Sequence, residues 1–273
     1  MKELTGKPMA NSLFQGFNIV ITVLILVFLG LTLVLVPIRG VPHLWSALDT
    51  AEIRFALALS LKTSLISTVL CTLVAVPVAY CLSRYPLPGR PILNVLVNIP
   101  LALPPIVSGV CLLMVFGTTP VGHFLTGLGL ELIFTVQGII AAQFFVNLPY
   151  MITVMKATME GVDRRLEFVA RTLGCNQWQA FFRVTLPMIR NGLVAALVIT
   201  WARALGEFGA VLMLAGATRM RTETLPISLY LNLTIGDLDA VMAVATVLMI
   251  ITTVSLLVFE RLGGRRVGRY TGL

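Results

Sequence analysis

The chain has 273 residues, of which 58% are hydrophobic and only 12% are charged, and its mean hydropathy is +0.95. A soluble domain is nearer half apolar and a quarter charged, so this composition excludes an ordinary soluble protein and predicts an integral membrane protein. The formal net charge of +8 could suggest a nucleic-acid partner, but arginines kept on the cytoplasmic side of a membrane would produce the same excess.

Six apolar runs are long enough, at about 20 residues each, to cross a bilayer as helices. They cover residues 17–36, 56–82, 92–116, 136–155, 193–214 and 240–259. We therefore predict an all-α polytopic membrane protein, with a short N-terminus (1–16), a transmembrane domain (17–260) and a basic tail (261–273). The first run resembles a signal peptide, but it is too long and no cleavage site follows it, so we interpret it as a retained span.

Basic residues between the spans indicate the orientation of the chain. With the N-terminus inside, 14 of the 20 lysines and arginines lie on the inner side, 4 on the outer side and 2 within spans. The positive-inside rule then predicts a multi-pass protein of the plasma (inner) membrane with both termini in the cytoplasm. The excess of positive charge therefore requires no nucleic acid.

The third span contains the sequence LALPPIVSG, with adjacent prolines at Pro104 and Pro105 and a hydroxyl at Ser108. Proline removes a backbone donor and clashes with the preceding turn. In hydrocarbon such a break is tolerated where the backbone is buried in protein or lines a wet cavity. We interpret the proline pair as a break that lines a translocation pathway, and simple kinking of the helix is the alternative.

The loop between the fourth and fifth spans, residues 160–190, is basic and aromatic. Apolar residues from Leu166 to Leu173 recur at i, i+3, i+4 and i+7, which places them on one face of a helix. Glu167 and Arg171 are four residues apart, in the order that favours an ion pair on a helix surface. This part of the loop is therefore predicted to be an amphipathic helix.

The second half of the loop is predicted to be another short helix. Gly174 supplies a left-handed position that ends the first helix, and Asn176 can cap the second. Trp178 and Phe182 lie on its apolar stripe, and Pro187 is expected to stop it before the fifth span. Such a loop either lies on lipid headgroups or docks into a partner protein, and the spacing alone leaves both possibilities open.

This loop resembles the signature of ABC importer permeases, which reads E-A-A, three residues, glycine, nine residues, I-x-L-P. Here Gly174 is followed after nine residues by V-T-L-P, which ends in Leu186 and Pro187. In the front half only Ala170 is kept, and Glu167 lies one place earlier than in the pattern. That variant is typical of the molybdate, tungstate and sulfate permeases. In the family this loop is the coupling helix, so the resemblance implies that it binds a cleft of an ATPase subunit.

The fifth span carries WARALGEFGAV, a second point of resemblance to the oxyanion permeases, with Arg203 and Glu207 one turn apart. A lone charge at mid-membrane costs about 3 kcal/mol on insertion scales, so we expect the two to form a mutual pair facing the protein interior. The pair either locks helices together or holds Arg203 where it guides a passing anion. Gly206 and Gly209 allow close helix approach, which suits a gate as well as an ordinary helix contact.

Two charged features lie toward the predicted outer side. Lys62 is expected to extend its ammonium group to the headgroups. The loop before the sixth span carries Arg219 and Arg221 beside Glu223, and it either meets a substrate-delivery protein or is solvated. Because importers of the resembling family receive substrate from a binding protein, docking is the preferred interpretation.

No Walker-type nucleotide motif, G-x-S-x-G or H-E-x-x-H motif occurs, and the four cysteines lack metal-ligand spacing. We therefore expect no catalytic residue, metal or cofactor in this chain. The resemblance, which covers roughly residues 56–260, implies a homodimer in the lipid bilayer with two ABC ATPase subunits that bind ATP and Mg²⁺. It also implies an extracytoplasmic solute-binding protein.

The substrate implied by the resemblance is molybdate or tungstate, with sulfate as the near alternative. The rival from another class is a secondary transporter driven by an ion gradient, although we find no convincing inverted repeat. A membrane enzyme is a poorer alternative because the sequence contains no nucleophile–base or metal constellation.

Overall fold

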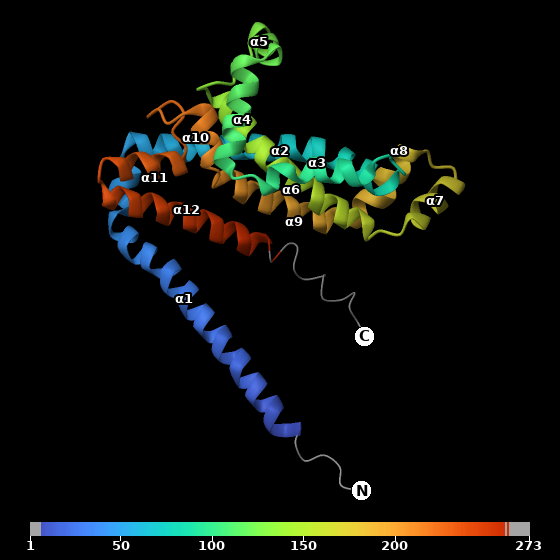
Figure 1. The fold of residues 1–273 in the computed structure, drawn as a ribbon, viewed down its shortest axis with the longest axis horizontal. Helices are drawn as coiled ribbons and strands as arrows, with labels where there is room; N and C mark the ends of the chain where they lie inside the picture. The colour runs from blue at the N-terminus through green and yellow to red at the C-terminus, as the bar shows by residue number, and fades with distance from the viewer. Residues whose placement is uncertain (1–6, 260, 262–273) are drawn as a thin grey trace.

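Figure 1 shows a computed structural model of the protein, which describes residues 7–259 and residue 261. All regular structure in this part of the chain is helical. The helices are α1 (Lys7–Asp49), α2 (Ala51–Arg84), α3 (Arg90–Ala102), α4 (Pro105–Thr118), α5 (Pro120–Gly127), α6 (Val136–Glu160), α7 (Arg164–Thr172), α8 (Gln177–Ala180), the π-helix η1 (Phe181–Thr185), α9 (Leu186–Leu205), α10 (Gly209–Ala215), α11 (Leu225–Thr234) and α12 (Leu238–Phe259).

Five of the described helices are long and apolar enough to cross a membrane, and the bent pair α3–α4, counted as one broken span, brings the number to six. The prediction of an all-α protein with about six spans is confirmed. The predicted basic tail lies, apart from residue 261, outside the described residues, as do the first six residues of the N-terminus.

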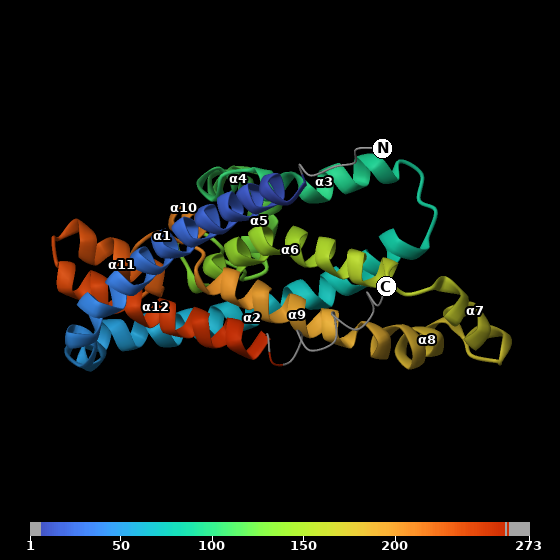
Figure 2. The ribbon, with the colours of Figure 1, turned by 90° about the horizontal axis from the view of Figure 1, so that it is seen from below.

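The body consists of α2, α6, α9 and α12, which run lengthwise beside one another (Figures 1 and 2). The loop with α7 and α8 lies at one end of the body, and α11 with the turn between α1 and α2 lies at the other. We call these the inner end and the outer end, after the sides of the membrane that the sequence analysis predicts for them. In Figure 1, α1 runs away from the body on one side, and α4 and α5 stand out on another.

Local capping signals explain where the long helices begin. Only Thr50 separates α1 from α2, and its Oγ1 accepts a hydrogen bond from the backbone N–H of Ile53 at 3.4 Å. Thr135 caps α6 in the same way, with its Oγ1 accepting from the N–H of Gly138 at 3.2 Å. A hydroxyl at this position satisfies one of the backbone donors that a helix start leaves unpaired.

Small side chains allow α6 to lie at the centre of the body. Ala75 and Ala79 on α2 are fully buried in one cluster with Met151 and Met155 of α6. Nearer the outer end, Ile139 of α6 is buried in a second cluster, which includes residues of α10. Small residues at helix contacts let backbones approach closely, as is usual in membrane bundles.

Two predicted spans are interrupted in the structure. The third is bent by 109° between α3 and α4, where the proline pair predicts a break. The fifth was predicted as one helix over residues 193–214, and this is wrong, because α9 ends at Leu205 and α10 begins at Gly209. The first predicted span is part of α1, which is 43 residues long and contains Pro37 and Pro42.

Candidate functional site

A glycine turn joins α7 to α8 at the inner end. Gly174 has a φ of +95°, and the Cys175 N–H donates to the carbonyl of Ala170 at 3.1 Å. The Gly174 N–H donates to the carbonyl of Arg171, also at 3.1 Å, which completes a Schellman motif. A Cβ at Gly174 would meet nothing within 4 Å, so the requirement for glycine is conformational and not steric. The predicted glycine turn is present.

The second helix of the loop begins as predicted but does not stop where predicted. Asn176 and Gln179 form a capping box at the start of α8. The chain then continues without a break through η1 into α9, and Pro187 lies in the first turn of α9. The expectation that Pro187 ends this helix is therefore wrong. Proline is compatible with a first helical turn because its missing N–H is not needed there.

Large apolar side chains are exposed on this loop. Phe168 is 66% exposed, Leu173 80%, Trp178 75% and Phe182 55%. The rings of Trp178 and Phe182 are stacked with their centroids 6.2 Å apart. We call these four residues the coupling surface. An open hollow of about 470 Å³ lies beside them, between α7 and α8, and its lining includes Phe168 and Arg171.

Glu167 fixes α7 to the body. Its carboxylate is buried and accepts hydrogen bonds from Arg84 Nε at 2.8 Å, the Tyr80 hydroxyl at 2.9 Å and the Thr185 hydroxyl at 2.7 Å. The expected pairing of Glu167 with Arg171 on the helix surface is therefore wrong. Arg84 belongs to α2 and Thr185 to η1, so one carboxylate ties α7 both to the body and to the second half of the loop.

The two helix breaks pack directly against each other. A Cβ added at Gly109 of α4 would lie 2.8 Å from the Cα of Ala210 in α10. A Cβ added at Gly209 would lie 3.0 Å from the backbone nitrogen of Ile106 and 3.1 Å from the Cβ of Pro105. Gly209 therefore serves a close helix contact in this conformation. The start of α4 and the start of α10 therefore cross with their backbones too close to leave room for a side chain at either glycine.

The residues predicted to line the pathway point in different directions. Pro104 and Pro105 are exposed. Ser108 is fully buried, and its hydroxyl has no hydrogen-bond partner among the described residues. In this conformation Ser108 therefore faces the protein interior, and the prolines are exposed together with Ile106 and Val107.

Arg203 and Glu207 do not form the expected pair. Arg203 Nε donates to Asn147 Oδ1 at 3.3 Å, and the guanidinium carbon lies 5.1 Å from the centroid of the Tyr150 ring. Glu207 is buried, and its Oε1 accepts the backbone N–H of Ala210 at 3.0 Å. Because α9 ends at Leu205, the four-residue spacing no longer places the two charges on one helix face.

Polar residues of α6 that were not singled out from the sequence support this region. Gln143 Nε2 donates to the carbonyl of Ala204 at 2.9 Å, near the end of α9. Asn147 Nδ2 donates to the carbonyl of Gln143 at 2.8 Å, which leaves its Oδ1 for Arg203. Breaking a helix in hydrocarbon frees backbone groups that require partners, and the Gln143 amide supplies one. In the sequence, the presence of two amide side chains inside the fourth apolar run is the signal that could have identified these residues.

The outer loop before α11 is packed and not merely solvated. Arg219 contacts Glu52 at 3.1 Å, Glu223 at 3.5 Å and the amide oxygen of Asn232 at 2.9 Å. Glu223 is fully buried. Arg219 is therefore neutralised within the chain, and Arg221 is the exposed arginine of this loop.

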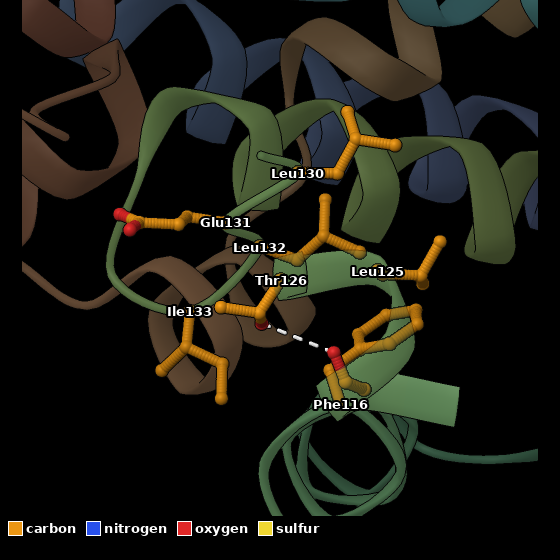
Figure 3. Close-up of a pocket in the computed structure, with 8 residues that line it drawn as sticks. Phe116, Leu125, Thr126, Leu130, Glu131, Leu132 and Ile133 are labelled. Carbon is orange, nitrogen blue, oxygen red and sulfur yellow. Dashed lines mark hydrogen bonds between the residues drawn. The ribbon is translucent and has the colours of Figure 1, made fainter. Parts of the chain in front are cut away.

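Figure 3 shows a cavity of about 190 Å³ on the segment that stands out from the body. Its lining consists of Phe116, Gly122, Leu125, Thr126, Leu130, Glu131, Leu132 and Ile133. The only charged side chain in this lining is a carboxylate, so the cavity is unsuited to an anion.

The class of protein follows from these features together with a family match. The chain belongs to the family of binding-protein-dependent transport system inner membrane components, whose pattern matches residues 72–269. The resemblance to ABC importer permeases is confirmed, and the chain is a membrane-spanning transport component.

Individual relatives agree with this assignment. The molybdenum transport system permease protein ModB of Mycobacterium tuberculosis is 38% identical over 236 residues, which cover 85% of this chain and 88% of that protein. The sulfate transport system permease protein CysW of Synechocystis sp. is 33% identical over 228 residues, 83% of each chain.

The fold also has a counterpart of known structure. A chain in the crystal structure of a bacterial alginate ABC transporter, in complex with an alginate pentasaccharide-bound periplasmic protein, superimposes with a TM-score of 0.76. The alignment covers 99% of this chain and 100% of that chain at 18% sequence identity. At that identity the likeness shows the fold alone.

Proposed function

We propose that this chain is the permease subunit of an ATP-driven importer that translocates an oxyanion, in the first place molybdate. The observation that carries the proposal is the coupling surface, whose four large apolar side chains are exposed on a loop that Glu167 fixes to the body. An exposed apolar patch of this kind is a mark of an interaction site. The family relation supports an ABC ATPase subunit as the partner.

The remaining partners follow from the same assignment. Because the sequence contains no nucleotide-binding motif, we assign ATP and Mg²⁺ to the partner ATPase subunits. One coupling surface serves one ATPase subunit and ATP is closed between two, so the transporter requires two copies of this chain. An extracytoplasmic solute-binding protein delivers the anion at the outer end, and both termini lie in the cytoplasm.

The substrate assignment combines the relatives with the charge of the site. The molybdenum permease is the more similar of the two named relatives, at 38% identity against 33% for the sulfate permease. Molybdate, tungstate and sulfate are all tetrahedral dianions, so tungstate and sulfate are the competing substrates. Arg203 is exposed, and it is held by an amide oxygen and an aromatic ring, which leaves its positive charge available to an anion.

Reconstitution tests the proposal directly. The chain is placed in proteoliposomes with its ATPase subunit and binding protein, and uptake of molybdate is measured with and without ATP. We expect uptake only when ATP and both partners are present, and competition by tungstate and sulfate then ranks the substrates. Uptake driven by an ion gradient without the ATPase would instead support a secondary transporter.

A pair of matched variants tests the coupling surface. Trp178 is 75% exposed on α8, and Trp45 is 78% exposed on α1. We expect Trp178→Ala to lose co-purification with the ATPase subunit and Trp45→Ala to retain it. Equal retention of the ATPase by both variants would show that the exposed loop contacts something other than the ATPase.

A further inference from the structure

A row of polar side chains descends α6 from the middle of the body toward the inner end. It consists of Asn147, Tyr150, Thr153 and Lys156, which follow one another at intervals of three residues. Rows of this spacing are inclined to the helix axis, so the row passes from one neighbouring helix to another. Polar groups in a membrane span are costly, and such positions are functional candidates by default.

The end of the row that lies in the middle of the body, at Asn147 and Tyr150, contacts α9. Asn147 accepts a hydrogen bond from Arg203 at 3.3 Å, and the Tyr150 ring lies below the guanidinium, 5.1 Å from its carbon to the ring centroid. Arg203 is therefore held in position by one hydrogen bond and one cation–π contact. Neither contact neutralises its charge.

The end of the row nearer the inner end of the body, at Thr153 and Lys156, contacts α3. The Thr153 hydroxyl donates to Asn98 Oδ1 at 2.8 Å, and Lys156 Nζ donates to Asn94 Oδ1 at 3.0 Å. Asn94 and Asn98 are one turn apart on α3. The ammonium group of Lys156 thus has an amide oxygen as its partner and two further N–H donors to offer.

The carboxylate of Glu160, which follows Lys156 on α6, is paired with another cation and not with Lys156. Glu160, one turn beyond Lys156, is bound by Arg90 of α3 at 2.8 Å. Within the described part of the chain, neither Lys156 nor Arg203 has a carboxylate within 4 Å. Neither cation therefore forms an ion pair within 4 Å. Lys156 belongs to the row, and Arg203 of α9 is bound to the first residue of the row, Asn147.

Arg203 and Lys156 lie at different depths along the axis of α6. Arg203 lies at the level of Asn147 and Tyr150, and Lys156 follows Tyr150 by six residues, which is about 9 Å along the helix axis. Thr153 provides a hydroxyl between them. Arg203 and Thr153 are exposed and Lys156 is half-buried, so the row is open on one side.

We infer that this row, together with Arg203 of α9, forms the inner part of the anion path, in which Arg203 is the first and Lys156 the second cationic binding position for a tetrahedral oxyanion. The inference rests on the proposed oxyanion transport and assigns a new residue, Lys156, to it. A dianion leaving Arg203 would otherwise cross this stretch without a compensating charge. The competing explanation is that Lys156 only ties α3 to α6 through Asn94.

Substitutions that separate charge from hydrogen bonding distinguish these explanations. Lys156→Gln can still donate to Asn94 but has no charge, and Lys156→Arg keeps the charge. Lys62→Gln removes an exposed cation of α2 that lies off the row and serves as the matched control. Uptake of molybdate and ATP hydrolysis are measured in the reconstituted transporter.

We expect Lys156→Gln to assemble and hydrolyse ATP but to take up molybdate at least about tenfold more slowly, because a charge-assisted hydrogen bond is lost. Lys156→Arg and Lys62→Gln should stay close to the wild type. Normal uptake by Lys156→Gln, or equal damage by Lys156→Gln and Lys156→Arg, would overturn the inference. A wild-type transporter that moves no oxyanion would overturn the proposed function and this inference with it.

A second measurement applies if Lys156→Gln fails to assemble. Thr153→Cys, in a chain whose four native cysteines are replaced, is labelled with a small hydrophilic thiol reagent in the reconstituted transporter. We expect sodium molybdate to slow this labelling and sodium chloride to leave it unchanged. Labelling that is equally fast in both salts would show that no oxyanion occupies the row.

Discussion

Replacing the buried carboxylate of Glu167 should release α7 from the body. The side chains of Arg84 and Glu167 are only 6% and 11% exposed, and their contact is 2.8 Å long. Removing one partner of such a pair costs about 3–5 kcal/mol, because the other charge is left buried and unpaired. Glu167→Gln keeps the shape, and its single amide oxygen can still accept from Arg84 and Thr185, which both donate to Oε1 of Glu167, so we expect the lower end of this range, about 3 kcal/mol.

Hydrogen exchange converts this figure into a measurement. Because each 1.4 kcal/mol is a factor of ten, a loss of about 3 kcal/mol should speed exchange of the amides in residues 164–176 about a hundredfold. Uptake should fall with it, because α7, which carries Phe168 of the coupling surface, is then no longer held against α2 and η1. Glu52→Gln is the control, since Glu52 is 51% exposed in its pair with Arg219 and such pairs contribute at most about 1 kcal/mol.

The result that would refute this reasoning is unchanged exchange in residues 164–176 of the Glu167→Gln protein. The three hydrogen bonds of Glu167 would then contribute nothing net to the position of α7. Faster exchange in the Glu52→Gln protein over the same residues would mean that the loop responds to general destabilisation and not to its own anchor.

Three further predictions concern the backbone and the charges of the helix breaks. Gly174→Val forces a β-branched residue into a φ of +95°, at about 1–3 kcal/mol, so uptake should fall while membrane abundance stays normal; unimpaired uptake would contradict this. Arg203 and Glu207 have separate partners, so the losses of membrane abundance in Arg203→Gln and Glu207→Gln should add in the double variant. A double variant that is more abundant than either single variant would show that the two residues are partners. Gly109→Ala places a Cβ 2.8 Å from the Cα of Ala210 and should destabilise the purified protein by about 1–3 kcal/mol; an unchanged thermal melting curve would show that the two breaks can separate without cost.

Features set by neighbouring residues could be predicted from the sequence. The apolar runs give the spans, and Gly174 and Asn176 give the turn and cap of the coupling loop. The break at Pro104 is present because the proline ring excludes a continuous helix whatever the surroundings. In each case the deciding interaction lies within a few residues along the chain.

Features set by distant residues could not be predicted. Glu167 is paired with Arg84, which is 83 residues away, and no local pattern favours that partner over Arg171. The pair expected between Arg203 and Glu207 assumed an unbroken helix, and the structure ends α9 before Glu207. The row from Asn147 to Lys156 is visible in the sequence at its regular spacing, but its meaning depends on the partners that α3 and α9 bring to it.

The helical stretch that carries Trp178 and Phe182 of the coupling surface continues without interruption into the fifth span. Residues Gln177–Leu205 form one continuous helical stretch of 29 residues, which is about 44 Å long at 1.5 Å per residue. An α-helix resists compression and bending far more than a loop does, so α9 is the stiff part of this stretch, from Leu186 to Leu205. The π-turn of η1 lies near its inner end. Gly206 follows its far end, three residues before Gly209, which packs against α4. The chain is therefore stiff between the two places where it can yield. In the proposed transporter, a movement of the coupling surface that passes η1 would be carried along α9 to the helix break after Leu205.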